Sequence, residues 1–160
     1  MIGLSKHFVT MTVNGMERSL HVDSADRLLD VLRDRLDMKS VKEGCGTGDC
    51  GLCAVLLDGR LVNSCLVLAA QCRGSVVTTL EGLVEDPQMK LLQEKFLKYG
   101  AAQCGFCTPA MLVAAKDIIS KNAKPSAEEI KVGISGVLCR CTGYYPILQA
   151  IQEASEAARP

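Results

Sequence analysis

The sequence has 160 residues, of which 48% are hydrophobic and 22% are charged, a mixture that suits one ordinary globular domain or two small ones. Eighteen Lys and Arg balance eighteen Asp and Glu, so no net charge points to nucleic acid or to an anionic membrane. No apolar run reaches the roughly 18 to 20 residues of a bilayer-spanning helix. The first residues, 1–7, form neither a secretory signal nor a twin-arginine leader, which predicts a cytoplasmic location.

Alternation of apolar and polar residues predicts short strands in the first half of the chain. They are expected over 9–13, 19–22, 54–57, 60–63 and 76–79. Asn14-Gly15 and Asp58-Gly59 stand between neighbouring strands, and both dipeptides favour the tight turn of a β-hairpin. The first half is therefore expected to contain two hairpins and one further strand.

Between the hairpins, leucines at helical spacing from Leu28 to Leu36 predict a short helix, with Ser24 or Asp26 as its N-cap. A glycine-rich stretch over 44–51 follows, and it is expected to be irregular. Lys39 and Lys42 flank this stretch. We expect both ammonium groups to be solvated, the alternative being that they help to dock a partner subunit.

The pattern changes around 81–87, and after it every predicted element is helical. One apolar stripe begins at Met89 and a second at Met111. Ser126 with Glu129 predicts a capping box, and Pro146 suits the first turn of a last helix. We therefore predict two domains, over 1–82 and 83–160.

Nine cysteines stand out against two histidines and no tryptophan. Thiols stay reduced in the cytosol, and an odd number cannot pair fully within one chain, so disulfides are a poor explanation. Two sets of four metal ligands with one cysteine left over fit the count. The spare is Cys72, which we expect to be a small buried hydrophobe.

The first set is Cys45-x4-Cys50-x2-Cys53 followed by Cys65, the spacing of plant-type [2Fe-2S] proteins. Such a cluster is anionic, and the surrounding glycines let backbone N–H groups wrap closely around its sulfurs. Two other interpretations are weaker. The glycines formally match a dinucleotide-binding loop, but a helix precedes them and a strand follows. A structural zinc site would favour paired C-x2-C knuckles.

The second set is Cys104-x2-Cys107 and Cys139-x-Cys141, two pairs at the ends of helical segments. A thioredoxin-like redox pair would need a preceding strand, which this region lacks. Cys107 precedes Thr108-Pro109 at a helix N-terminus, where the helix dipole favours an anionic ligand. A second metal cluster is therefore expected, on weaker grounds than the first.

Three runs, K-E-G-C-G-T-G-D-C-G-L-C over 42–53, Q-C-G-F-C-T-P over 103–109 and L-C-R-C-T-G-Y over 138–144, resemble the small iron–sulfur subunit of the molybdenum hydroxylases. This is the family of xanthine dehydrogenase, aldehyde oxidoreductase and carbon monoxide dehydrogenase. The resemblance spans nearly the whole chain. Val137 departs from it, since the family usually has Asn at this position.

The resemblance implies an α+β protein with an N-terminal β-grasp, ferredoxin-like domain and a C-terminal four-helix domain. It implies that Cys45, Cys50, Cys53 and Cys65 hold a [2Fe-2S] cluster near a flavin. It implies likewise that Cys104, Cys107, Cys139 and Cys141 hold a second [2Fe-2S] cluster near a molybdopterin, which Gln103 would contact.

The function that follows is that of a non-catalytic electron-transfer subunit between a molybdopterin-binding large subunit and an FAD-binding medium subunit, in a heterotrimer or a dimer of heterotrimers. The complex would hydroxylate a purine, another N-heterocycle or an aldehyde with oxygen from water. The alternatives are a stand-alone two-cluster ferredoxin, a subunit of a reductase such as 4-hydroxybenzoyl-CoA reductase, and a zinc-stabilised interaction module.

Overall fold

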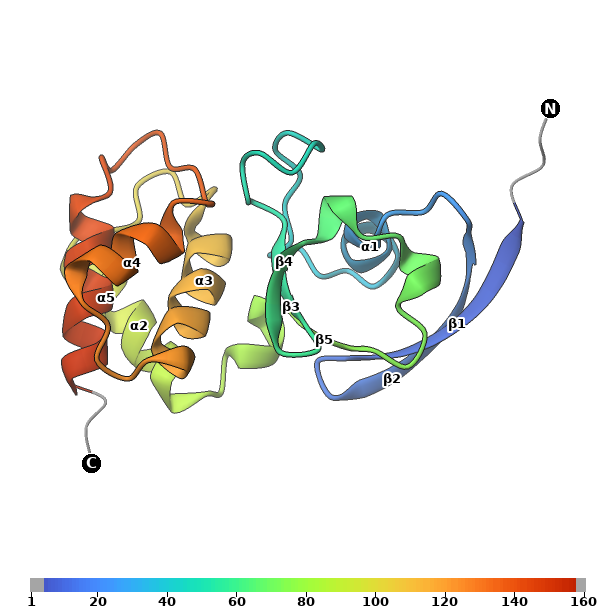
Figure 1. Ribbon diagram of the computed structural model, residues 1–160, viewed down its shortest axis with the longest axis horizontal. Helices are drawn as coiled ribbons and strands as arrows, with labels where there is room; N and C mark the ends of the chain where they lie inside the picture. The colour runs from blue at the N-terminus through green and yellow to red at the C-terminus, as the bar shows by residue number, and fades with distance from the viewer. Residues whose placement is uncertain (1–4, 158–160) are drawn as a thin grey trace.

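The computed structural model describes residues 5–157 and places a β-sheet part and a helical part next to each other along the long axis of the molecule (Figure 1). Most of the N-terminal stretch from which we predict a cytoplasmic location lies outside the described residues. Within 5–157, no helix is both long enough and apolar enough to cross a membrane.

Five strands form one mixed sheet in the order β2-β1-β5-β3-β4. They are β1 (Lys6–Val13), β2 (Met16–Asp23), β3 (Ala54–Leu57), β4 (Arg60–Asn63) and β5 (Val76–Thr78). The last strand lies between the first and the third, parallel to β1 and antiparallel to β3, while the two hairpins form the edges. The prediction of a β-grasp domain in an α+β protein is confirmed.

Both predicted hairpins form with the predicted turn residues. Asn14 and Gly15 have φ of 52° and 78°, and Asp58 and Gly59 have φ of 49° and 75°. Two successive positive φ angles define the type I′ turn, whose twist matches that of the strands it joins. The turns set the registers Val13↔Met16 and Leu57↔Arg60.

The helix expected from Leu28 is present, but it has neither the predicted cap nor regular α-geometry. It consists of α1 (Leu28–Asp30) and a π-helical continuation, η1 (Val31–Arg35), and its N-cap is Arg27 without a side-chain cap. The Leu28 N–H donates to the Val67 carbonyl at 2.7 Å. A distant segment therefore satisfies this helix end, so neither Ser24 nor Asp26 caps it.

The second half contains four helices, as predicted. They are α2 (Pro87–Lys98), α3 (Thr108–Lys121), α4 (Ala127–Ile134) and α5 (Tyr145–Ala157). Asp86 caps α2 by accepting hydrogen bonds from the N–H groups of Gln88 and Met89. The predicted capping box of Ser126 and Glu129 is present at the start of α4.

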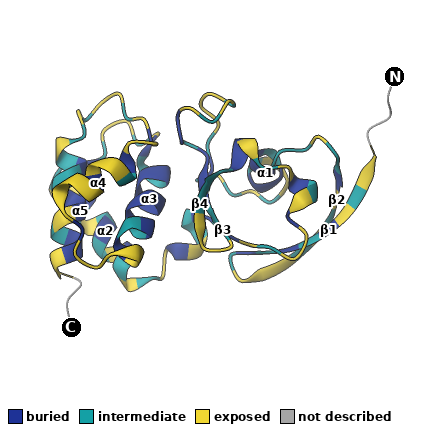
Figure 2. Ribbon diagram, in the orientation of Figure 1, coloured by how far each residue is buried: buried dark blue, intermediate teal, exposed yellow. Residues whose placement is uncertain are grey.

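Each half has its own buried core, which Figure 2 shows as dark blue inner faces on the sheet and the helices. Val9, Val55 and Val77 belong to the sheet core, together with Leu28, Leu29 and Leu32 of the short helix. The helical core is larger and includes the predicted stripes. A 3-10 turn, η4 (Leu80–Leu83), joins the halves, and Leu83 packs into the helical core. The boundary between 82 and 83 stays a prediction.

A hydrogen-bonded carboxylate fixes this junction to the segment that enters the glycine-rich loop. Glu81 accepts hydrogen bonds from the Ser40 N–H, the Ser40 hydroxyl and the Thr79 hydroxyl at 2.8, 2.5 and 2.5 Å. Burial alone would raise the pKa of Glu81, but these donors outweigh it and lower the pKa. The carboxylate therefore stays charged and ties the loop to the linker.

Phe96 and its neighbour Leu97 provide a matched test of the helical core. Phe96 is 2% exposed and Leu97 is 79% exposed, on the same turn of α2. Phe96→Ala should cost about 3–5 kcal/mol because it leaves a cavity, whereas Leu97→Ala should change stability by less than about 0.5 kcal/mol. Thermal unfolding followed by helical circular dichroism compares the two variants, and equal midpoints would contradict this core.

Candidate metal centres

The first four predicted cysteines meet where the irregular loop joins the β3–β4 hairpin. Cys45 and Cys50 lie on the loop, Cys53 directly precedes β3, and Cys65 lies in the 3-10 turn η2 (Ser64–Leu66) after β4. The register Ala54↔Asn63 brings the two ends of the hairpin together, and the Ser64 N–H donates to the Cys53 carbonyl at 3.3 Å. The hairpin thus places Cys65 beside Cys53, although twelve positions separate them.

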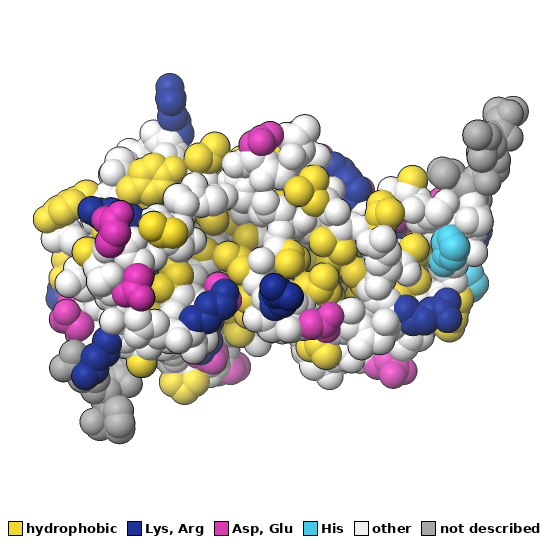
Figure 3. Space-filling view, in the orientation of Figure 1, with side chains coloured by type: hydrophobic (Ala, Val, Ile, Leu, Met, Phe, Trp, Pro, Cys, Tyr) yellow, Lys and Arg dark blue, Asp and Glu magenta, His cyan; other side chains and the backbone are white. Residues whose placement is uncertain are grey.

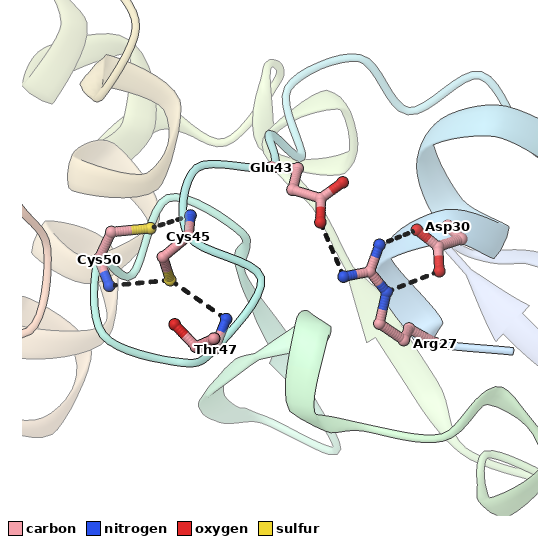
Figure 4. Close-up of polar contacts among 6 residues, drawn as sticks. All are labelled: Arg27, Asp30, Glu43, Cys45, Thr47 and Cys50. Carbon is pink, nitrogen blue, oxygen red and sulfur yellow. Dashed lines mark hydrogen bonds and ion pairs between the residues drawn. The ribbon is translucent and has the colours of Figure 1, made fainter. Parts of the chain in front are cut away.

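Backbone N–H groups in the loop point at cysteine sulfurs. The Cys45 N–H donates to Cys50 Sγ at 3.3 Å, and the N–H groups of Thr47 and Cys50 both donate to Cys45 Sγ at 3.4 Å (Figure 4). Donors of this kind stabilise thiolates and the sulfurs of an anionic cluster. The loop therefore has the polar environment that the spacing predicts.

Glycine is required in this loop for steric reasons. A Cβ on Gly44 would lie 2.7 Å from Cys50 Sγ, and one on Gly48 would lie 2.5 Å from Leu66 Cδ1. Gly48 also has φ of 87°, a conformation that L side chains rarely adopt. At Gly44 the backbone thus lies closer to a cysteine sulfur than a residue with a Cβ would allow, and at Gly48 the positive φ favours glycine.

Thiol pKa values within this set diverge according to their surroundings. Hydrogen bonds from Thr47 and Cys50 lower the pKa of Cys45 to about 6. Burial, together with the neighbouring Cys53 thiol, raises the pKa of Cys65 to about 11. A coordinating metal cation deprotonates a thiol outright, so its positive charge would stabilise the Cys65 thiolate that burial alone disfavours.

The second four cysteines meet between two helix-connecting loops. Cys104 and Cys107 lie between α2 and α3, with Cys107 at the N-cap position of α3, and Cys139 and Cys141 lie between α4 and α5. The sulfurs of Cys104 and Cys141 are 3.5 Å apart. Burial raises the pKa of Cys107 to about 12. A cavity of about 590 Å³ is lined by all four cysteines.

Tyr144 braces the Cys139–Cys141 loop, a role that the sequence did not reveal. The Cys139 N–H donates to Tyr144 Oη at 2.9 Å, and Tyr144 Oη donates to the Val137 carbonyl at 3.4 Å. Thr142 Oγ1 lies 3.2 Å from Cys139 Sγ. The side chain of Val137 is buried in the helical core.

Among residues 5–157, no group of three His, Cys, Asp or Glu side chains is spaced to hold a single metal ion. In a [2Fe-2S] cluster, four thiolates hold two irons. Each of the two cysteine sets offers that number of ligands.

The loops that carry the two cysteine sets are in direct backbone contact. The Leu138 N–H donates to the Cys50 carbonyl at 2.9 Å. A Cβ on Gly51 would lie 2.0 Å from the Gly136 carbonyl oxygen, so the chains pass each other at a distance that excludes any side chain. Cys50 is thereby joined to Leu138, the residue before Cys139, by one hydrogen bond.

The other residues singled out from the sequence lie outside these two sets. Gln103 is exposed next to Cys104. Cys72 is 1% exposed in the sheet core, and its thiol donates to the Leu68 carbonyl, as expected of a buried hydrophobe. Lys39 is solvated as expected, but Lys42 is half-buried and turned toward the second cysteine set.

Comparisons with known proteins divide the chain along the same lines. A family model described as a 2Fe-2S iron-sulfur cluster binding domain matches residues 11–75. A second, described as a [2Fe-2S] binding domain, matches residues 79–152. Each family match includes one of the two cysteine sets.

Relatives match over nearly the whole length. The nicotinate dehydrogenase small FeS subunit of Eubacterium barkeri is 46% identical over 153 residues, which cover 96% of this chain and 98% of that one. The aldehyde oxidoreductase of Megalodesulfovibrio gigas is 40% identical over 91% of this chain but only 16% of its own. In the crystal structure of quinoline 2-oxidoreductase from Pseudomonas putida 86, a chain that is 41% identical superposes with a TM-score of 0.90 over 96% of both chains.

Gly44 and Gly136 provide a matched test of the first loop. Neither has a positive φ, but only at Gly44 would a Cβ collide with a cysteine sulfur, while the space around Gly136 is open. Gly44→Ala should lower the iron content of the purified protein to about half, since a sulfur held by iron cannot move aside. Gly136→Ala should keep its iron, and equal iron contents would contradict the steric argument.

Proposed function

This chain belongs to the small iron–sulfur subunits of the molybdenum hydroxylases, and on that basis we propose that each of its two cysteine sets holds one [2Fe-2S] cluster. Cys45, Cys50, Cys53 and Cys65 are the proposed ligands of the first cluster. Cys104, Cys107, Cys139 and Cys141 are those of the second. The observation that carries the proposal is the meeting of eight cysteines in two sets of four, each within one family match.

The chain is the electron-transfer subunit of an oxidoreductase complex and is not itself catalytic. Each [2Fe-2S] cluster, when bound, accepts and passes on one electron at a time. The residues of the chain supply thiolates, N–H donors to the sulfurs, and the contact between Cys50 and Leu138 that keeps the two sites adjacent. In the proposed function, electrons pass from one cluster to the other within this subunit.

The catalytic partners are separate polypeptides or fused domains, because relatives occur as small subunits and as 16% of a longer chain. In the proposed complex, the second cluster faces a molybdopterin-binding large subunit, and the exposed amide of Gln103 contacts the pterin. The first cluster faces an FAD-binding medium subunit. We propose a heterotrimer or its dimer.

The proposed substrate is a purine, another N-heterocycle or an aldehyde, hydroxylated at carbon with oxygen from water. Two of the relatives compared above are named for nicotinate and quinoline, which supports an N-heterocycle. The choice is made on the molybdenum-bearing partner, since this chain contributes only electron transfer. A stand-alone ferredoxin finds no support among these relatives, because they are parts of larger enzymes.

The ligand assignment is tested by removing one thiol at a time. Cys50→Ala and Cys107→Ala should each lose about two of four irons, together with one of two electron paramagnetic resonance signals, and the two variants should lose different signals. Cys72→Ala is the matched control and should keep both signals, because Cys72 lies in neither set. Loss of iron from Cys72→Ala, or full iron in Cys50→Ala, would contradict the assignment.

A further inference from the structure

Lys42 connects the segment before the first cysteine set to the loop of the second. Its ammonium group donates to the Gly105 carbonyl at 3.4 Å and lies 4.9 Å from the centre of the Phe106 ring. Gly105 and Phe106 are the two residues between Cys104 and Cys107, and Lys42 itself is three positions before Cys45. Lys42 thus lies next to the first cysteine set in the sequence, and its side chain contacts the loop of the second.

The charge of Lys42 has no carboxylate partner among the described residues. Every ion pair within 5–157 involves a different lysine or arginine. Lys42 is instead half-buried against a carbonyl and an aromatic face. A carbonyl dipole and a π face each attract a cation, but neither neutralises it. A half-buried ammonium held in this way can still interact with a nearby anion.

Lys39 shows that this placement is specific to Lys42. Lys39 precedes the same loop by only three further positions, yet its side chain is 58% exposed. It pairs with Asp37 at 3.0 Å and donates to the Arg33 carbonyl, both within its own segment. The two side chains thus point in different directions. That of Lys39 is exposed to solvent, and that of Lys42 contacts the loop between α2 and α3.

We propose that Lys42 is a charge bridge between the two [2Fe-2S] clusters, a positioning residue that favours the reduced state of both and holds the Cys104–Cys107 loop against the first loop. The inference rests on the proposed function, because it requires both clusters. Each cluster gains one electron on reduction. A positive charge nearby stabilises the extra electron by Coulomb attraction.

The test is a redox titration of the purified complex, followed by electron paramagnetic resonance of both clusters. Lys42→Met removes the charge and keeps the length, and Lys42→Gln also keeps a donor for the Gly105 carbonyl. At a fixed potential, each variant should lower the ratio of reduced to oxidised cluster by about tenfold, which is about 59 mV for one electron. Lys42→Arg keeps the positive charge and should leave both reduction potentials close to those of the unsubstituted complex. Lys39→Met should leave both potentials unchanged.

Unchanged potentials in Lys42→Met or Lys42→Gln, with both signals at full intensity, would overturn the inference. An equal shift in Lys39→Met would also overturn it, because the effect would then be one of net charge. If both neutral variants lose a cluster, Phe106→Leu decides. Phe106 is 47% exposed, so this change should preserve the fold. In Phe106→Leu, a lowering of the reduction potentials by less than the shift of about 59 mV expected of the neutral Lys42 variants supports the charge bridge. Unchanged potentials in Phe106→Leu contradict it.

The result also separates this inference from the proposed function. If the unsubstituted complex lacks two [2Fe-2S] signals, the proposed function fails. If both signals are present and only the potentials of the Lys42 variants fail to move, the charge bridge alone is wrong.

Discussion

The close approach of Gly51 to the Gly136 carbonyl fixes where the two halves of the molecule meet, and the arrangement of both cysteine sets depends on it. No residue with a Cβ could occupy position 51, where the added atom would lie 2.0 Å from that oxygen. The contact allows the Leu138 N–H to reach the Cys50 carbonyl. Two folding units that share no sheet and no helix thereby bring the loops of the two cysteine sets together. On the face drawn in Figure 3, hydrophobic side chains gather over the middle of the molecule.

Electrostatics at this boundary follows from the same geometry. Thiolates and sulfides of an iron–sulfur cluster carry negative charge. In the first loop, the backbone N–H groups of Cys45, Thr47 and Cys50 donate hydrogen bonds to cysteine sulfurs and stabilise such charge. On the side away from the helices, Arg27 joins Asp30 and Glu43 in ion pairs of 2.6 and 2.7 Å (Figure 4). These carboxylates hold the charge of Arg27 locally, whereas Lys42 carries an unneutralised charge toward the helical half. Arg27 and Lys42 therefore have different electrostatic surroundings.

The sequence predicted the features that are encoded locally. The turns at Asn14-Gly15 and Asp58-Gly59 follow from positive φ angles that few residue types tolerate, and the capping box at Ser126 follows from two side chains three positions apart. Ligand spacing and the family resemblance identified the cysteine sets before their geometry was known. The domain limits and the individual ligands remain predictions, because they follow from spacing and resemblance.

Features that depend on distant residues could not be predicted. The start of α1 is satisfied by the Val67 carbonyl, about 40 positions away, so the search for a local cap at Ser24 or Asp26 gave a wrong prediction. Tyr144, whose φ is 67°, accepts a hydrogen bond from the Cys139 N–H through its Oη, a contact that no local pattern indicated. The direction of Lys42 likewise depends on Gly105, 63 positions further along the chain. In each case the hydrogen-bond partner is brought close by the tertiary structure, which the local sequence pattern does not indicate.

The central claim, that this chain carries two binuclear clusters beside a molybdenum-bearing partner, is tested most directly by metal analysis of the complex purified through this chain from its native source. Two [2Fe-2S] clusters and one molybdenum centre give about four irons per molybdenum. That ratio is the result we predict. Iron without molybdenum, in a protein that purifies alone, would contradict the assignment as a subunit, and zinc in place of iron would contradict both clusters.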